Sequence, residues 1–371
     1  MECFQRFHQI NANPAEYARN WKKKTGGKVV GHFCSYTPQE LIVAAGALPY
    51  RILSSGADII HADGHLQAYC CGLVRGGLED ALSGRLDFLD GAVFPHTCDS
   101  IQRLSDIWRL NAGFDFHIDI VLPVKLDTGS AAEYMAAVLQ RFRADLERGV
   151  GVAISDPMVQ AAIRTCNRVR RSLARLYAVR RDCPQAISGS DLHAVLKAAL
   201  VMDRAELAGA LEALIAALPA APPGRPSGKR LVLSGGLCSM PDIYPVVEAS
   251  GGRVVWDDFC TGSRYFEGEV DETQPPIRAL TERYRTRVVC PAKHAGIDSR
   301  GRYLLEKVAE HRADGVIFLL LKFCDPHAFD YPYMKAMLDQ AGIPSLLFEI
   351  EDQVSSEGQL RTRCEAFMEM L

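Results

Sequence analysis

Two cysteines occupy the same kind of position in two distant parts of the chain. Cys98 and Cys324 each follow a run of apolar residues, and each precedes an aspartate and a helical pattern. A thiol at such a junction lies at a helix N-terminus, where the dipole and free N–H groups favour the metal-binding thiolate. Open α/β sheets also bind ligands at the carboxyl ends of their strands. The two Cys-Asp segments therefore predict one thiolate site assembled from two halves of the chain.

A third cysteine, Cys71, follows the polar loop His61–His65 and stands at the start of a predicted helix, which we expect to run from about Gln67 to Leu82. Three thiolates can hold three irons of a cubane cluster and leave the fourth iron open. Buried structural thiols are an equally good interpretation from the residues alone. The chain has 12 cysteines but no CxxC pair, which argues against a zinc ribbon or a ferredoxin-like motif.

Three other side chains are weaker candidates for catalysis. Ser35 follows a predicted strand and could touch a substrate, and His65 is near Cys71 and could donate a proton. An ordinary hydrogen-bonded histidine is the simpler interpretation of His65. Thr37 and Glu40 are predicted to form a capping box at a helix start, so a catalytic base is only the second interpretation of Glu40.

Strand and helix patterns alternate in both halves of the chain, which predicts parallel strands with right-handed crossovers. Between the halves lies a purely helical stretch rich in alanine and leucine, followed by a proline-rich linker. The predicted fold is α/β, with two Rossmann-like (flavodoxin-like) parallel-sheet domains and a helical insert. The boundaries are 1–130 for the N-terminal domain, 131–218 for the helical segment, 219–229 for the linker and 230–371 for the C-terminal domain.

Composition excludes several classes of function. The 371 residues are 48% hydrophobic and 23% charged with a net charge of −3, and no basic stripe predicts nucleic-acid binding. No apolar run reaches the roughly 18 residues of a membrane span, and the N-terminal residues lack a signal peptide's apolar region, so we expect a cytoplasmic protein. The GxGxxG and P-loop motifs are absent, which argues against dinucleotide binding and ATP hydrolysis. The pair Asp257 and Asp258 could act as two acids, but a loop pair facing water is the simpler prediction.

Five motifs occur in an order that is typical of one family. They are Tyr36-Thr-Pro-Gln-Glu-Leu41, Ala68-Tyr-Cys-Cys71, Phe94-Pro-His-Thr-Cys-Asp99, Asp257-Asp-Phe-Cys-Thr-Gly-Ser-Arg-Tyr-Phe266 and Phe323-Cys-Asp-Pro326. With them the chain resembles the catalytic subunits of the 2-hydroxyacyl-CoA dehydratase and benzoyl-CoA reductase family. In length and spacing it is most similar to the smaller, β-type (component D) subunits.

This resemblance implies a 4Fe-4S cluster held by Cys71, Cys98 and Cys324. It also implies a second family subunit as partner, an ATP-hydrolysing iron–sulfur activator that donates a low-potential electron, and an acyl-CoA substrate. In the dehydratases the hydroxyl leaves from a ketyl radical anion and an enoyl-CoA forms. One-electron reduction is needed because the β-hydrogen of a hydroxyacyl thioester is not acidic.

The surplus of cysteines leaves two alternatives open. A related branch of the family carries a double-cubane, eight-iron cluster, reduces small molecules and forms homodimers. Its additional ligands would come from Cys34, Cys70, Cys238, Cys260 and Cys290. The second alternative is an electron-relay subunit without an active site of its own. Lys125, Lys293 and Arg264 are the candidate cations for the CoA phosphates.

Overall fold

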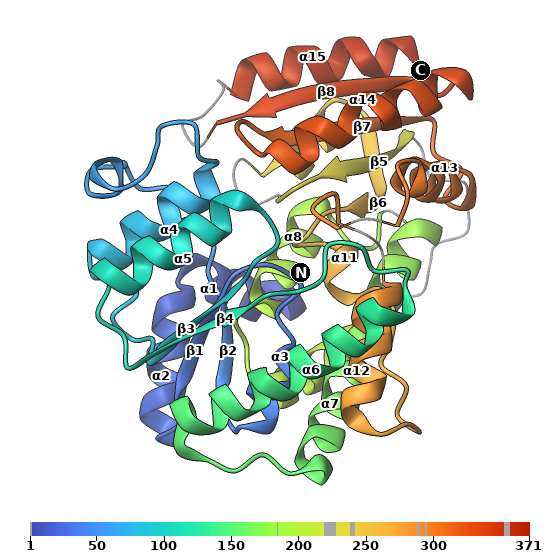
Figure 1. Ribbon diagram of the computed structural model, residues 1–371. Coiled ribbons are helices and arrows are strands. Elements are labelled where there is room, and N and C mark those ends of the chain that lie inside the picture. Colours follow the sequence, from blue (N-terminus) through green and yellow to red (C-terminus); the bar gives the residue numbers. More distant parts are fainter. Residues whose placement is uncertain are drawn as a thin grey trace.

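The computed structural model in Figure 1 contains two parallel sheets of four strands each, surrounded by helices. It describes residues 2–183, 185–218, 228–237, 242–287, 290–293, 295–351 and 357–371. The strand orders are β2-β1-β3-β4 and β6-β5-β7-β8, so both sheets have the same flavodoxin-like topology. The predicted α/β fold class is confirmed. Most of the predicted linker, residues 219–227, lies outside the described residues.

The N-terminal sheet is buried on both faces except at its edge. Its strands are β1 (Val29–His32), β2 (Leu48–Arg51), β3 (Gly91–Pro95) and β4 (Phe116–Ile120). Every residue of the first three strands is buried, whereas the edge strand β4 is partly exposed. The connecting helices are α3 (Gln39–Ala44), α4 (Gly72–Leu82) and α5 (Asp99–Asn111).

The C-terminal sheet repeats this pattern. Its strands are β5 (Lys229–Gly235), β6 (Gly252–Asp258), β7 (Gly315–Leu321) and β8 (Ser345–Ile350). The central strand β7 is a continuous apolar run, and β8 is the partly exposed edge. The helices around it are α10 (Ile243–Ala249), α13 (Ser299–Glu310), α14 (Asp325–Gln340) and α15 (Glu357–Met370).

Helices from several parts of the chain fill the space beside the two sheets. They are α1 (Gln5–Ala12), α2 (Pro14–Thr25), α6 (Gly129–Leu146), α7 (Asp156–Asp182), α8 (Gly189–Ala199), α9 (Arg204–Ala217), α11 (Ser263–Phe266) and α12 (Pro276–Thr286). Short turns occur at Glu2–Phe4, Ala62–Gly64 and Glu147–Gly151. Helix α12 packs against α6 and α7, so a segment from the second half of the chain completes the core of the first half.

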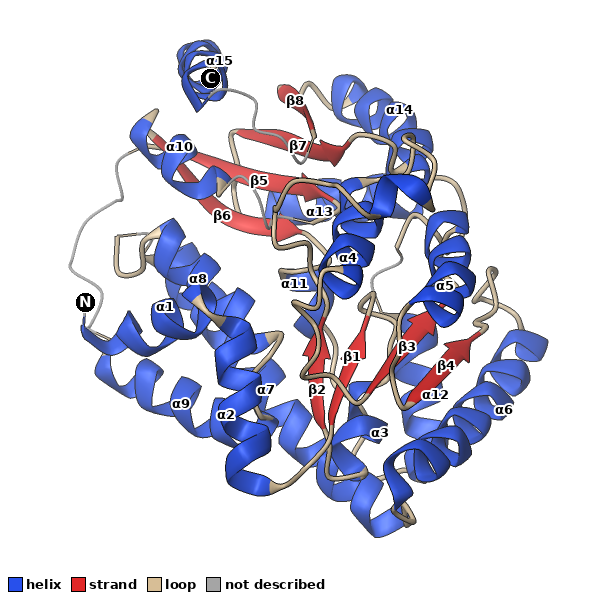
Figure 2. Ribbon diagram, turned by 90° about the vertical axis from the view of Figure 1, so that its left-hand side faces the viewer, coloured by secondary structure: helices blue, strands red, loops and turns tan. Residues whose placement is uncertain are grey.

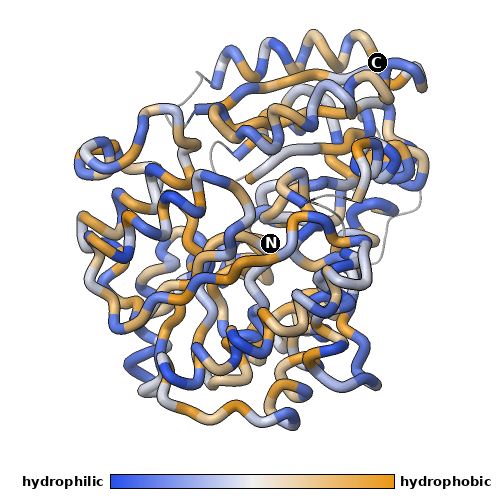
Figure 3. The backbone as a smooth tube through the Cα atoms, viewed as in Figure 1, coloured by the Kyte–Doolittle hydropathy of each residue, from blue (hydrophilic) through white to orange (hydrophobic). Residues whose placement is uncertain are grey.

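An aromatic cluster lies behind the carboxyl ends of β1 and β3. The ring centroids of Phe33 and Phe94 are 5.1 Å apart, and that of Trp108 on α5 is 5.4 Å from Phe94. All three side chains are almost fully buried. Figure 3 shows hydrophobic residues along the strands of both sheets. Because the cluster packs α5 against β1 and β3, it fixes the positions at which these strands end, next to Cys34 and Cys98.

Two local predictions are wrong. Helix α3 begins at Gln39 without a side-chain cap, and the Thr37 hydroxyl instead donates a hydrogen bond to the Phe33 carbonyl oxygen at 2.7 Å, so the capping box with Glu40 does not form. The helix expected from about Gln67 begins at Gly72. No helix in the described part of the chain is long and apolar enough to cross a membrane.

Candidate functional site

The carboxyl ends of both sheets point toward the region between them (Figure 2). Three helices begin there, and a cysteine is the N-cap residue of each: Cys71 before α4, Cys98 before α5 and Cys324 before α14. The Cys98 thiol interacts electrostatically with that of Cys71, and the Cys324 thiol interacts with both. The structure therefore brings together three cysteines that are far apart in the sequence.

Burial dominates the acidity of these thiols. It raises the pKa of Cys98 to about 12 and also raises the pKa of Cys324. Backbone hydrogen bonds at Ile101 and His327 lower the two pKa values, as expected at helix N-termini, but the effect of desolvation is larger. The Cys98 and Cys324 thiols are therefore neutral unless a positive charge is added. A bound metal supplies such a charge and deprotonates its thiol ligands.

The loop before Cys71 is held by a carboxylate of the helix that follows. Glu79 Oε2 accepts hydrogen bonds from the backbone N–H groups of Ile60, His61 and Ala62 at 2.7–2.9 Å. Its Oε1 is 2.8 Å from the His61 ring. Burial raises the pKa of Glu79, but the hydrogen bonds from His61 and the backbone outweigh it and bring the pKa to about 2. This clamp fixes the chain where it enters α4.

A second group of thiols consists of Cys34, Cys260 and Cys290, called the inner thiols below. The Cys260 and Cys290 thiols hydrogen-bond to each other, and Cys290 interacts electrostatically with Cys34. The hydrogen bond from Cys290, together with Arg264 and His327, holds the pKa of Cys260 well below its ordinary value. The inner thiols also interact with the first group, since Cys34 affects Cys98 and Cys260 affects Cys324.

The other two extra ligand candidates are Cys70 and Cys238. Cys70 is next to Cys71, but its thiol donates to the Gln67 side-chain oxygen at 3.8 Å. Burial raises the pKa of Cys70. Cys238 lies outside the described residues.

Two buried cations near these thiols have no carboxylate partner among the described residues. Arg51 is 2% exposed, and its guanidinium makes no hydrogen bond or ion pair with any described residue. It interacts electrostatically with Cys34 and Cys260. Lys293, also 2% exposed, donates to the Leu122 carbonyl oxygen at 3.3 Å and faces Cys34, Cys290 and Cys98. An unpaired buried charge costs several kcal/mol, so these cations fit a site that holds an anionic group.

Sequence reasoning missed Arg51. Its only local signal is that an arginine ends the buried strand β2, in the tetrapeptide Leu48-Pro-Tyr-Arg51. Whether such an arginine finds a carboxylate depends on contacts between distant segments, and here it finds none among the described residues.

An iron–sulfur cluster fits this donor set better than a single metal ion does. Among the described residues, no group of three or more His, Cys, Asp or Glu side chains is arranged to hold one ion. In a cubane, each thiolate binds a different iron, so its ligands do not converge on one point. Three thiols at helix N-termini, one buried and two partly buried, match such an anionic cluster, as do the nearby cations that have no carboxylate partner among the described residues.

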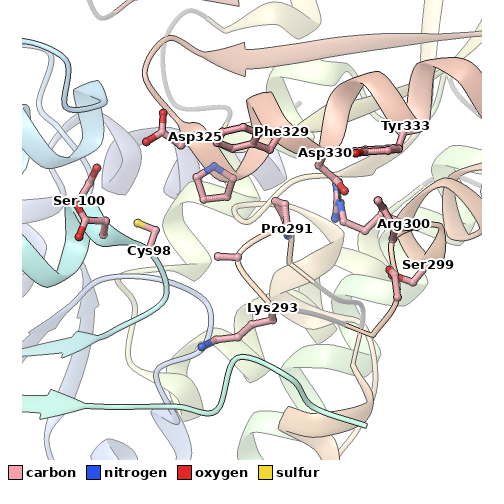
Figure 4. A pocket seen from close by; sticks show the side chains of 15 residues that line it. Cys98, Ser100, Pro291, Lys293, Ser299, Arg300, Asp325, Phe329, Asp330 and Tyr333 are labelled. Carbon is pink, nitrogen blue, oxygen red and sulfur yellow. Dashed lines mark hydrogen bonds and ion pairs between the residues drawn. The ribbon is translucent and has the colours of Figure 1, made fainter.

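A cavity of about 480 Å³ opens beside Cys98. Figure 4 shows Cys98, Ser100 and Asp325 at one end and Ser299, Arg300 and Tyr333 at the other. The exposed Phe329 and Ile297 add apolar surface to its lining. A cavity of this size, apolar with a few polar groups, suits a small organic ligand next to the thiols.

The pair Asp257 and Asp258 does not face water, and that prediction is wrong. Both side chains are at most 1% exposed. Asp258 forms ion pairs with Arg264 at 3.0 Å and with Arg300 at 2.6 Å. Asp257 accepts hydrogen bonds from the Tyr177 and Tyr244 hydroxyls, and from the backbone N–H groups of Phe259 and Ser263. The pair was predicted to be exposed because a local pattern does not reveal partners from α7, α10 and α13. Through these contacts, the two aspartates shape the turn that carries Cys260.

The three weaker catalytic candidates are placed apart from the cavity. Glu40 is fully buried, pairs with Arg170 and accepts from the Tyr284 hydroxyl at 3.2 Å. Burial raises its pKa, but Arg170 and Arg283 lower it more.

Ser35 is buried, and its hydroxyl accepts from Arg287 at 3.1 Å. His65 is exposed in the loop before Cys71. Their catalytic roles stay predictions.

The three candidate cations for CoA are in very different surroundings. Lys125 is 67% exposed and 3.8 Å from Asp127, so it is free to reach a phosphate. Arg264 is buried in its ion pair with Asp258. Lys293 is also buried but borders the cavity. Of the three, Lys125 alone is exposed enough to contact a phosphate in solvent.

Comparison with known proteins gives a consistent result. A family model described as 2-hydroxyglutaryl-CoA dehydratase, D-component, matches residues 34–371. The chain is 29% identical to the (R)-phenyllactyl-CoA dehydratase beta subunit of Clostridium sporogenes over 368 residues, which cover 99% of this chain and 98% of the relative. It is 29% identical to the lactoyl-CoA dehydratase subunit beta of Anaerotignum propionicum over 98% of this chain and 96% of the relative. It is also 29% identical to a benzoyl-CoA reductase subunit of Thauera aromatica over 95% of this chain and 94% of the relative.

Proposed function

Because the chain belongs to the 2-hydroxyglutaryl-CoA dehydratase D-component family, we propose that it is an iron–sulfur subunit of a radical 2-hydroxyacyl-CoA dehydratase, or of a benzoyl-CoA-reductase-like enzyme. Its relatives are subunits of named dehydratases and of a reductase. We further propose a second family subunit as its partner. The electron comes from an ATP-hydrolysing iron–sulfur activator, in keeping with the absence of a P-loop from this chain.

The meeting of Cys71, Cys98 and Cys324 at three helix N-termini carries this proposal. These cysteines would hold a 4Fe-4S cluster with one iron free of protein thiolate. When bound, the cluster would supply one-electron chemistry and a Lewis-acidic iron to the acyl thioester.

The chain's own residues would shape the rest of the site. The cavity beside Cys98 would take the acyl end of the substrate, with Phe329 and Ile297 as apolar contacts. The buried ion pair of Arg300 with Asp258 and Asp330 would keep that wall rigid. Burial of the thiols would exclude water from the cysteine side of the cavity.

Iron counting after anaerobic purification tests the proposal. We expect about four irons and four sulfides per chain, and a low-potential electron paramagnetic resonance signal on reduction. With the second subunit, activator and ATP, the preparation should convert a 2-hydroxyacyl-CoA to an enoyl-CoA, or reduce benzoyl-CoA. A protein that takes up no iron under these conditions would contradict the proposal.

The inner thiols favour a second candidate, a double-cubane reductase of small molecules. Cys34, Cys260 and Cys290 would provide three further thiolates, and the unpaired Arg51 beside them would be neutralised by the larger anionic cluster. This candidate predicts about eight irons per chain, a homodimer and no need for a second subunit.

A third candidate, an electron relay without an active site, needs a catalytic partner subunit, unlike the double-cubane reductase. It predicts that the chain alone, supplied with activator and ATP, produces no turnover. Full turnover without a second subunit would exclude it.

A further inference from the structure

Lys293 is a buried cation at the boundary between the two groups of thiols. Its side chain is 2% exposed and lines the same cavity as Cys98. Figure 4 shows it extending along the side of the cavity on which Cys98 lies. The backbone N–H of Lys293 donates to the Cys290 carbonyl oxygen at 2.8 Å, so a tight turn sets the position of the lysine relative to the inner thiols.

In the described part of the chain, the ammonium of Lys293 has a neutral hydrogen-bond partner and thiols as its nearest potential anions. Its hydrogen bond goes to the Leu122 carbonyl oxygen at 3.3 Å, and no carboxylate in the described part of the chain forms an ion pair with it. Burial lowers the pKa of Lys293, and negative charge on Cys34, Cys290 and Cys98 opposes that effect. Without thiolates, no described carboxylate neutralises the desolvated positive charge.

We propose that Lys293 supplies a buried positive charge to the iron–sulfur site. Its ammonium neutralises part of the negative charge of the thiolates and so raises the reduction potential of the bound cluster. This inference rests on the proposed function. Reduction adds one negative charge to a cluster, so a nearby buried cation stabilises the reduced form more than the oxidised form. The lysine acts through the cluster and requires no contact with substrate.

The same geometry has opposite consequences in the metal-free and loaded protein. In the metal-free protein, the unpaired ammonium costs free energy, and a neutral side chain of similar size should be more stable there. In the loaded protein, the ammonium and the thiolates attract each other, and its removal should weaken the site. A lysine that merely packs against its neighbours would stabilise both forms.

The test uses the full chain, reconstituted with iron and sulfide under anaerobic conditions. For Lys293→Met we expect the ratio of reduced to oxidised cluster at a fixed solution potential to fall about tenfold, a shift of about 59 mV for a one-electron couple. The melting temperature of the metal-free variant should rise by about 2 °C. Lys293→Arg keeps the charge and should hold the potential near that of the wild type.

Lys307→Met is the matched control, because the Lys307 side chain is only 12% exposed and is paired with Glu267 and Glu310. It should leave the potential unchanged and lower the melting temperature of the metal-free protein. An unchanged potential in Lys293→Met, or a destabilised metal-free variant, would overturn the inference. A wild-type protein that binds no cluster would instead overturn the proposed function itself.

Discussion

The outer thiols Cys71, Cys98 and Cys324 and the inner thiols Cys34, Cys260 and Cys290 lie in two different electrostatic environments. The outer cysteines are N-cap residues of helices, Cys98 lines the cavity, and burial raises the pKa of Cys98 and of Cys324. Among the inner thiols, Cys260 has a lowered pKa because Cys290, Arg264 and His327 stabilise its thiolate. Helix N-termini alone do not offset desolvation here, whereas a buried guanidinium with hydrogen bonds does.

This difference assigns different roles to the two groups. Burial keeps the Cys98 and Cys324 thiols protonated unless a positive charge is added, and Cys98 lines the cavity that a small ligand can enter. The inner thiols interact with cations that the protein already provides, deeper in the fold. We therefore expect the outer group to be required for cluster binding, and the inner group to tune the site or extend it.

Replacing an outer thiol should have the largest effect. We expect Cys98→Ser and Cys324→Ser to lower bound iron by about tenfold or more, because even lost outer-shell partners cost roughly 10–100-fold in metal affinity. Iron analysis of anaerobically purified protein measures this. Cys364→Ser, a buried cysteine of α15, should keep its iron. Full iron content in Cys98→Ser would show that the outer group is not the cluster site.

Breaking the ion pairs beside the inner thiols should have the next largest effect, on stability. Asp258→Asn leaves Arg264 and Arg300 without their shared carboxylate in a buried position. The expected loss is about 3–5 kcal/mol in the free energy of unfolding, measured by urea denaturation. The exposed Asp271→Asn is the control and should leave the urea midpoint essentially unchanged. A small loss of unfolding free energy in Asp258→Asn would mean that these ion pairs do not stabilise the region around the inner thiols.

The clamp that positions Cys71 should give a smaller effect that depends on pH. The pKa of Glu79 falls from 4.5 to about 2 on folding, so its contribution to stability is fully present above pH 4.5 and is lost as the pH falls toward 2. Glu79→Gln should lose about 1–2 kcal/mol at pH 7 and show a flatter dependence of melting temperature on pH below 5. If the melting temperature depends on pH in the same way in the variant and the wild type, the clamp does not contribute to stability.

Replacing an inner thiol should have the smallest effect if one cubane is bound. Cys260→Ser should keep about four irons per chain and change stability by about 1 kcal/mol. Iron analysis and urea denaturation of the same preparation report both quantities. If the wild type instead holds about eight irons and the variant loses half, the inner thiols are cluster ligands and the double-cubane candidate is favoured.

The fold class and the junctions at Cys98 and Cys324 could be predicted from the amino-acid order. Apolar runs specify buried parallel strands, and the aspartate after each of these cysteines, with Pro326 after the second, is a local signal for a helix start. Such signals act over a few residues, so they can be read without a structure. The motifs of the family resemblance were also readable, and the family match over residues 34–371 confirms that resemblance.

Which thiols meet and which charges remain unpaired became visible only in the folded chain. Asp258 was predicted to face water, yet it pairs with arginines from α11 and α13. The environments of Arg51 and Lys293 could not be read from the local sequence, because they depend on segments that are distant in the chain, such as Lys293 and Leu122. Burial and electrostatics depend on these long-range contacts, and a local sequence pattern does not contain them.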